Sequence, residues 1–177
     1  MTISVVVFMA ALAAFKIDAA PLELTGVSLS CAEFAANKLP GILNKDYTFP
    51  TQQEVQYFKH KGMKFLRFPI LWERVQPTLN GSFDSVYFSN IDSFITGATS
   101  AGMKVLLDPH NYARYRGNVV GASSVTGANF ADLWTKFANI YKNNSRVIFG
   151  LVGVCVSSPV SLLVKISLLS SITQLLY

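Results

Sequence analysis

The chain has few of the residues that bind metals or build disulfide frameworks. Its 177 residues include two cysteines, Cys31 and Cys155, and two histidines. Two cysteines so far apart exclude a dense disulfide framework, and neither belongs to a metal-ligand motif. The sequence therefore predicts no metal and no cofactor.

Charge is also sparse, and it is unevenly distributed. Charged residues make up 14% of the sequence, the formal net charge is +5, and no Asp or Glu follows Asp132. The Lys and Arg residues are scattered, without the basic run or the mixture of basic and aromatic residues that is typical of nucleic-acid binding. The positive balance therefore reflects an acid-free C-terminal end, and no nucleic-acid partner is expected.

The first twenty residues have the features of a secretory signal. An apolar run from Val5 to Phe15 is followed by small residues at Ala19 and Ala20, where cleavage can occur. The alternative interpretation of this segment is a buried N-terminal strand or helix. Together with the two glycosylation sequons at Asn80 and Asn143, the segment predicts an extracellular protein that is N-glycosylated at these two asparagines.

Residues 21–151 alternate short apolar runs with amphipathic segments, a pattern that predicts βα units and a parallel sheet. Thr51 and Glu54 have the spacing of a capping box, Asp84 is a candidate N-cap, and Asn129 is expected to cap the third helix. The expected strands cover residues 24–29, 64–68, 104–107 and 147–151. The third helix has an apolar stripe at helical spacing, which we assign to the core: Phe130, Leu133, Trp134, Phe137, Ile140 and Tyr141.

An internal repeat supports this division into units. The segment 62–69, GMKFLRFP, is similar to the segment 102–109, GMKVLLDP, at a shift of about forty residues, the size of one βα unit. Parallel strands joined by right-handed crossovers end on the same side of a sheet. Glu33 and the segments 67–72 and 108–115 are therefore expected to converge there.

Arg67 is the first candidate functional residue at this edge. Its planar guanidinium can orient a carboxylate and keep it ionised. The alternative is a structural salt bridge with Glu33, Glu73 or Asp108.

The residues around the third strand end suit a sugar ligand. His110 and Asn111 offer hydrogen-bonding groups for hydroxyls, and Tyr112, Tyr115 and Trp72 provide flat apolar faces with polar tips. His110 taken alone has the alternative interpretation of a loop histidine with satisfied hydrogen bonds. Its expected place beside Arg67 favours function.

Five blocks carry a resemblance to the first half of the fungal family 5 glycoside hydrolases, specifically the secreted endo-β-1,4-glucanases (cellulases). The blocks are GVSLSCAEF, YTFPT, GMKFLRFPILWERVQP, VLLDPHNYARY and VIFGL, and they span residues 26–151. The resemblance implies an α/β fold of the (β/α)8 TIM-barrel family, present here as about the first four βα units. It also implies hydrolysis of β-glucan with retention, using two glutamates. We expect this chain, if it folds, to be a monomer.

The same resemblance implies roles for individual residues. Arg67 matches the arginine that holds the nucleophile, and His110 matches the histidine that lines the subsite beside the scissile bond. Tyr112 and Trp72 are carried over as substrate-binding residues, and Asn111 is a further substrate-binding candidate from its hydrogen-bonding groups.

The chain departs from this family after its fourth strand. The family has an Asn-Glu-Pro motif there, whereas Gly153 and Val154 stand in the positions of the asparagine and of the acid/base glutamate. The nucleophile belongs at the end of strand seven, and no acidic residue follows Asp132. Retaining hydrolysis requires two carboxyl groups about 5 to 5.5 Å apart, so we expect this chain to be inactive.

The segment 152–177 differs in composition and is interpreted as a non-homologous apolar tail. It is too interrupted by serine and by Lys165 for a membrane span. Our hypothesis is translation of an unspliced intron or a shifted frame, and sequencing the transcript across the codon for Leu151 tests it. The competing account is a genuine, diverged short protein, whose four strands would leave two unpaired edges and favour aggregation.

Three classes of function therefore stay open from the sequence. The first is a secreted endo-β-1,4-glucanase by descent, or another family 5 specificity such as mannanase or exo-glucanase. The second is a non-catalytic remnant that binds β-glucan. The third is an interaction protein that docks on a membrane or a partner through its apolar tail.

Overall fold

The computed structural model describes residues 24–151. The expected signal at 1–20 and the tail at 152–177, with Gly153, Val154 and Cys155, lie outside the described residues. The helices are α1 (Gln52–His60), α2 (Trp72–Val75), α3 (Ser85–Ser100) and α4 (Gly127–Tyr141). The strands are β1 (Gly26–Ser28), β2 (Phe65–Ile70), β3 (Lys104–Pro109), β4 (Arg114–Tyr115), β5 (Asn118–Val119) and β6 (Val147–Phe149).

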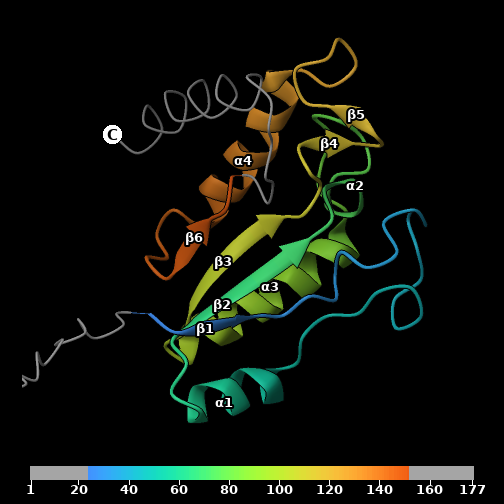
Figure 1. Cartoon of the computed structure of the whole chain (residues 1–177). Helices are drawn as coiled ribbons and strands as arrows, with labels where there is room; N and C mark the ends of the chain where they lie inside the picture. Colours follow the sequence, from blue (N-terminus) through green and yellow to red (C-terminus); the bar gives the residue numbers. More distant parts are fainter. Residues whose placement is uncertain (1–23, 152–177) are drawn as a thin grey trace, which may run out of the picture.

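Four strands form one parallel sheet in the order β1-β2-β3-β6 (Figure 1). Each pair of neighbouring strands is connected through helical structure: α1, then α2 with α3, then α4. All four predicted strands are present, and their order follows the chain. This is the architecture of part of a (β/α)8 barrel, as the resemblance implied.

The two faces of the sheet differ sharply in burial. Leu66, Phe68 and Ile70 alternate along β2 and are fully buried, whereas Phe65 and Arg67 between them are only partly buried. Because successive side chains of a strand point to opposite faces, the first set faces the helices and the second set faces what is the interior of a complete barrel. The Phe68 ring packs on the ring of Phe94 in α3, with 4.4 Å between centroids.

The first helix begins as the sequence predicts. The Thr51 hydroxyl accepts the Glu54 N–H at 3.2 Å, and the Glu54 carboxylate accepts the Thr51 N–H at 2.7 Å. Asp84 likewise caps α3 by accepting the Tyr87 N–H. Gly62 and Gly102 follow these two helices with positive φ of 80° and 89°, the conformation that glycine adopts most readily.

The predicted cap of the last helix is wrong by one turn. The N-cap of α4 is Thr126, and Asn129 is the third helical residue, whose side-chain Oδ1 accepts the Thr126 N–H at 2.7 Å. The prediction fails because it places the cap directly before the first apolar residue, Phe130. The helix in fact begins earlier, at Gly127, and its first turn contains no residue of the apolar stripe.

The predicted apolar stripe of α4 is correct except at its end. Trp134, Phe137 and Tyr141 are buried, which confirms Trp134 as a core residue. Ile140 is exposed, because it lies at the margin of the stripe, where the helix turns its side chain away from the sheet.

Strand β2 extends two residues beyond its predicted end, through Pro69. Proline lacks the N–H that a strand interior normally donates. The Arg67 carbonyl accepts the Leu29 N–H, so the backbone groups of Arg67 and Pro69 turn toward β1. The last residue pair between β1 and β2 is Ser28 with Arg67. Pro69 therefore has no β1 residue beside it, and the missing N–H leaves no strand hydrogen bond unmade.

Two elements were not predicted from the sequence. Helix α2 is a single turn, and all four of its residues are buried. The antiparallel pair of β4 and β5 forms a small hairpin in the segment between β3 and α4. Both lie beyond the carboxyl ends of the sheet strands, where they shape the candidate site.

In the described part of the chain, β1 and β6 each pair with a strand on one side only. Between residues 24 and 151 no helix is long and apolar enough to cross a membrane.

Truncation of Phe68 tests the assignment of the core. We expect Phe68→Ala to lower the free energy of unfolding by about 3–5 kcal/mol, because it removes a fully buried ring between the sheet and α3. The matched control is Val86→Ala in α3, where the side chain is 64% exposed, and the expected change is within about 0.5 kcal/mol. Urea unfolding measures both, and equal effects of the two substitutions would contradict the core assignment.

Candidate active site

Polar side chains gather at the carboxyl ends of β1, β2 and β3. Arg67 lies opposite Ser28 of β1 and Leu106 of β3, and Asp108 lies two residues beyond Leu106. The period of two in a strand places Ser28, Arg67 and Asp108 on the same face of the sheet. The structure thus brings residues from three strands to one site.

Arg67 is the centre of this cluster. Its Nη2 forms an ion pair with the Asp108 carboxylate, and its Nη1 donates to the Ser28 hydroxyl at 2.9 Å. The Arg67 side chain is 29% exposed, whereas the Asp108 side chain is 3% exposed. Of the three carboxylates considered as structural partners, the structure pairs Arg67 with Asp108.

His110 extends the cluster from β3 toward solvent. The Arg67 Nη2 lies 2.8 Å from His110 Nδ1, and His110 Nε2 lies 3.1 Å from the Tyr112 hydroxyl. A guanidinium only donates hydrogen bonds, so Nδ1 must be the acceptor. The arrangement therefore requires a neutral imidazole with its proton on Nε2, which donates to Tyr112.

Tyr112 presents an aromatic ring to solvent beside His110. It is 60% exposed, and its ring meets the His110 ring edge-on with 4.9 Å between centroids. Its backbone φ is 52°, an uncommon conformation for a tyrosine. An exposed ring beside a polar cluster is the arrangement that suits a sugar face.

Trp72 does not lie on the site surface, contrary to the expectation. It is 1% exposed, its indole contacts the rings of Tyr115 and Phe130, and its Nε1 donates to the Gln76 side chain at 2.9 Å. Tyr115 is buried as well, and its hydroxyl donates to the Pro77 carbonyl. Both rings were predicted as ligand contacts because they follow strand ends, but α2 and the β4–β5 hairpin turn them into the core.

Asn111 is also committed internally. Its Oδ1 accepts the Trp72 N–H at 2.8 Å, and its Nδ2 donates to the buried Glu73 carboxylate. The amide therefore connects the segment after β3 to helix α2. Of the predicted substrate contacts, the structure leaves His110 and Tyr112 at the surface and places Asn111 and Trp72 beneath them.

Glu33 and Cys31 lie in the segment after β1. The Glu33 carboxylate accepts the Cys31 N–H at 2.9 Å, and no ion pair joins it to Arg67 within residues 24–151. Burial, reinforced by the nearby Glu33 charge, raises the pKa of the Cys31 thiol to about 11. A thiol that stays protonated at neutral pH is a poor nucleophile, so we assign Cys31 no chemical role.

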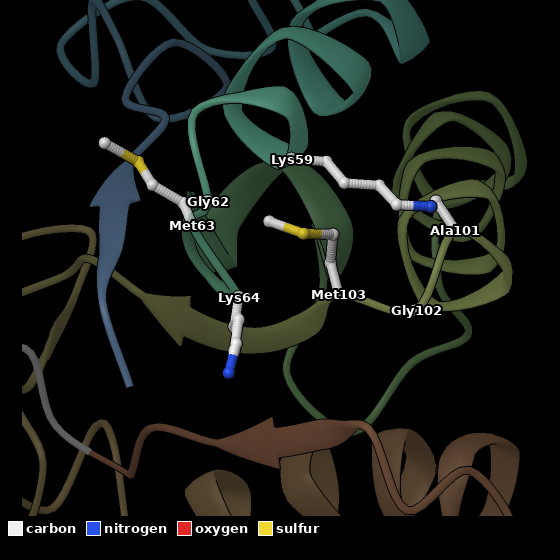
Figure 2. A pocket seen from close by; sticks show the side chains of 7 residues that line it. All are labelled: Lys59, Gly62, Met63, Lys64, Ala101, Gly102 and Met103. Carbon is white, nitrogen blue, oxygen red and sulfur yellow. The ribbon is translucent and has the colours of Figure 1, made fainter. Parts of the chain in front are cut away.

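A cavity lies at the opposite end of the sheet from this polar cluster. It has a volume of about 240 Å³ and its walls come from both copies of the internal repeat (Figure 2). The lining residues are Lys59, Gly62, Met63, Lys64, Ala101, Gly102 and Met103. This lining contains no carboxylate and no imidazole, and its titratable groups are the amines of Lys59 and Lys64. No group of three or more metal-binding side chains occurs in the described range 24–151.

Sequence reasoning missed Ser28 and the role of Glu73. Ser28 contacts Arg67 only because β1 and β2 pair in a particular register, which single-sequence periodicity does not give. Glu73 had a visible signal, since an acidic residue inside the apolar run 68–75 is costly unless it has a partner.

Comparison with known proteins relates this geometry to a family. A family model described as Cellulase (glycosyl hydrolase family 5) matches residues 16–152. The chain is 36% identical over 135 residues to endo-beta-1,4-glucanase B of Aspergillus niger, an alignment that covers 76% of this chain and 39% of that protein. The chain thus spans well under half the length of the curated relatives that it matches.

Solved structures are similar in fold and sequence. The endo-beta-1,4-glucanase Xac0029 of Xanthomonas axonopodis pv. citri superposes with a TM-score of 0.72 and 42% identity, covering 74% of this chain and 42% of that one. Endoglucanase Cel5A of Pseudomonas stutzeri, solved in complex with cellobiose, superposes with a TM-score of 0.80 and 29% identity over 85% of this chain and 46% of that one.

The contacts of the two histidines predict opposite tautomers. His60 Nδ1 lies 2.7 Å from the Gln56 carbonyl, which only accepts, so its proton belongs on Nδ1, whereas His110 carries its proton on Nε2. We expect long-range ¹H–¹⁵N NMR spectra in mildly alkaline solution, where an ordinary imidazole is neutral, to show this difference. Observation of an Nδ1 proton on His110 would contradict its contact with Arg67.

Proposed function

The chain belongs to glycosyl hydrolase family 5, and from this membership we propose that it derives from a secreted endo-β-1,4-glucanase whose substrate is β-glucan. The observation that carries the proposal is the cluster of Arg67, Asp108 and His110 at the carboxyl ends of β2 and β3, with the Tyr112 ring exposed beside it. In barrels of this class the carboxyl ends of the strands carry the chemistry.

We choose β-1,4-glucan over mannan as the substrate, and internal over terminal cleavage, because of the names of the relatives. Aspergillus and Xanthomonas relatives that match this chain are named endo-beta-1,4-glucanases, and the Pseudomonas structure holds cellobiose. A fungal relative from Emericella nidulans, 34% identical over 124 residues, has the same name. These names support the endo-β-1,4-glucanase interpretation over mannanase or exo-glucanase.

Arg67 supplies a positive charge that is already oriented. Its contacts with Ser28, Asp108 and His110 engage three of the five guanidinium N–H groups. The remaining donors can hold a carboxylate in its ionised form, which is the role that the resemblance gives to this arginine. In the same proposal His110 and Tyr112 contact the sugar through Nε2, the hydroxyl and the aromatic ring.

Three carboxylates at this end of the described sheet are engaged in internal contacts. Asp108 pairs with Arg67, Glu73 accepts from Asn111 and from the Arg116 N–H, and Glu33 accepts from Cys31. Retention requires one free carboxyl to protonate the leaving oxygen and another to attack the sugar carbon. Since the 177 residues contain no acid after Asp132, we propose that this polypeptide by itself does not hydrolyse glucan.

A second candidate function is β-glucan binding without cleavage. It is favoured by the same two facts: the ring of Tyr112 is exposed beside donors and acceptors, and the acids around it are committed. Secretion is also part of the proposal. It is supported by the signal-like segment 1–20 and by the exposure of both sequon asparagines, Asn80 and Asn143.

Two assays on the purified 177-residue chain test these proposals. We expect no release of reducing ends from carboxymethyl cellulose, and clear turnover would overturn the proposed inactivity. We also expect β-glucan in a native gel to retard the chain.

Tyr112→Ala should weaken that binding about fivefold, because a stacked ring contributes about 1 kcal/mol. Tyr57→Ala is the matched control, since Tyr57 is 57% exposed on α1, away from the carboxyl ends of the strands. No retardation of the unmodified chain, or equal effects of the two substitutions, would remove β-glucan binding at this site.

A further inference from the structure

Helix α2 contains the only two adjacent residues of opposite charge that the structure buries between residues 24 and 151. Glu73 and Arg74 are both buried, yet neither forms an ion pair with another residue in that range. Burying a charge is costly unless hydrogen bonds satisfy it. Each of the two side chains obtains those bonds from a different loop.

Arg74 holds the loop that follows β1. Its guanidinium donates to the carbonyls of Ala32 at 2.8 Å, Ala35 at 2.9 Å and Pro40 at 2.9 Å. It also lies over the Tyr47 ring, 4.2 Å from the centroid. The backbone in this loop has no regular strand or helix to pair with, so Arg74 takes the place of a hydrogen-bonding partner.

Glu73 holds the loop that follows β3. One carboxylate oxygen accepts from the Asn111 Nδ2, and the other accepts the Arg116 N–H at 2.6 Å. Tyr112, Ala113 and Arg116 all have positive φ, a conformation that non-glycine residues adopt only when their surroundings hold them there. The Glu73 contacts are made by Asn111, directly before this strained stretch, and by Arg116, its last residue.

We propose that Glu73 and Arg74 are positioning residues that act as a two-way clasp, each fixing one of the two loops at the Arg67–His110 site. Glu73 sets the course of the β3 loop and thereby the orientation of His110 and Tyr112. Arg74 sets the β1 loop independently. The link from Glu73 to ligand binding rests on the proposed function, whereas the link from Glu73 to loop structure does not.

The first test is amide hydrogen exchange on the full chain. Glu73→Gln keeps one oxygen to accept the Arg116 N–H but places an amide donor against the Asn111 Nδ2 donor, so we expect exchange across residues 111–117 to become about tenfold faster. Exchange in the β1 loop, residues 31–47, should stay unchanged. Arg74→Lys is the matched control, and it should accelerate exchange in 31–47 and leave 111–117 unchanged.

The second test is rescue by an exchange of partners, in the double variant Glu73→Gln with Asn111→Asp. The amide nitrogen introduced at position 73 can donate to the carboxylate introduced at position 111. The amide oxygen at position 73 still accepts the Arg116 N–H, and the carboxylate at position 111 still accepts the Trp72 N–H. Protection across 111–117 should therefore return to the level of the unmodified chain. If Glu73→Gln fails to fold, recovery of the unfolding midpoint in the double variant gives the same readout.

The outcomes separate the clasp from the proposed function. Unchanged exchange in Glu73→Gln, spread of its effect to 31–47, or no recovery in the double variant would overturn the clasp. With the expected exchange pattern, β-glucan retardation should be lost in Glu73→Gln and return in the double variant. If exchange follows the expectation while the unmodified chain is not retarded, the loop positioning holds and the proposed glucan site fails.

Discussion

The ion pair between Arg67 and Asp108 is the interaction on which the polar end of this sheet depends. Besides these two residues and the exposed Lys104, strands β2 and β3 are apolar, and the Asp108 side chain is almost fully buried. A buried charge that loses its partner costs several kcal/mol, so the Asp108 carboxylate requires Arg67. Ser28 and His110 each accept a further hydrogen bond from the guanidinium. The contacts that stabilise this end of the sheet therefore also position the candidate site residues.

Much of the fold could be predicted because its signals are local. Strand alternation, the Thr51–Glu54 capping box and the stripe through Trp134 and Phe137 each depend on residues close in sequence. The convergence of Arg67 with Asp108 and His110 followed from parallel topology alone. The placement of Trp72 and Tyr115 did not, because their burial depends on a single-turn helix and a hairpin of two-residue strands, both too short to have a periodic signal. The cap of α4 was misplaced for a related reason, since its first turn lacks apolar residues.

The error over Trp72 changes the picture of the site. The sequence suggested three exposed rings as ligand contacts. In the structure only Tyr112 is exposed, and the rings of Trp72 and Tyr115 pack against each other in the core. The amide of Asn111 joins this part of the core to the site through Trp72 and Glu73. Asn111, which lies between the candidate ligand contacts His110 and Tyr112, thus holds the backbone that carries them.

Membership of the family and the capacity for hydrolysis depend on different residues. Arg67, Asp108 and His110 are held by contacts within β1, β2 and β3, so this half of the site is ordered without a carboxylate from any further strand. Each member also has a structural reason to be present, because Asp108 needs Arg67 whether or not a nucleophile is bound. The cluster is consequently explained by the fold, whereas family membership rests on the similarity to known proteins. Hydrolysis, in contrast, depends on two free carboxyl groups, and in the described residues the acids at this end of the sheet are already engaged by Arg67, Asn111, Arg116 and Cys31.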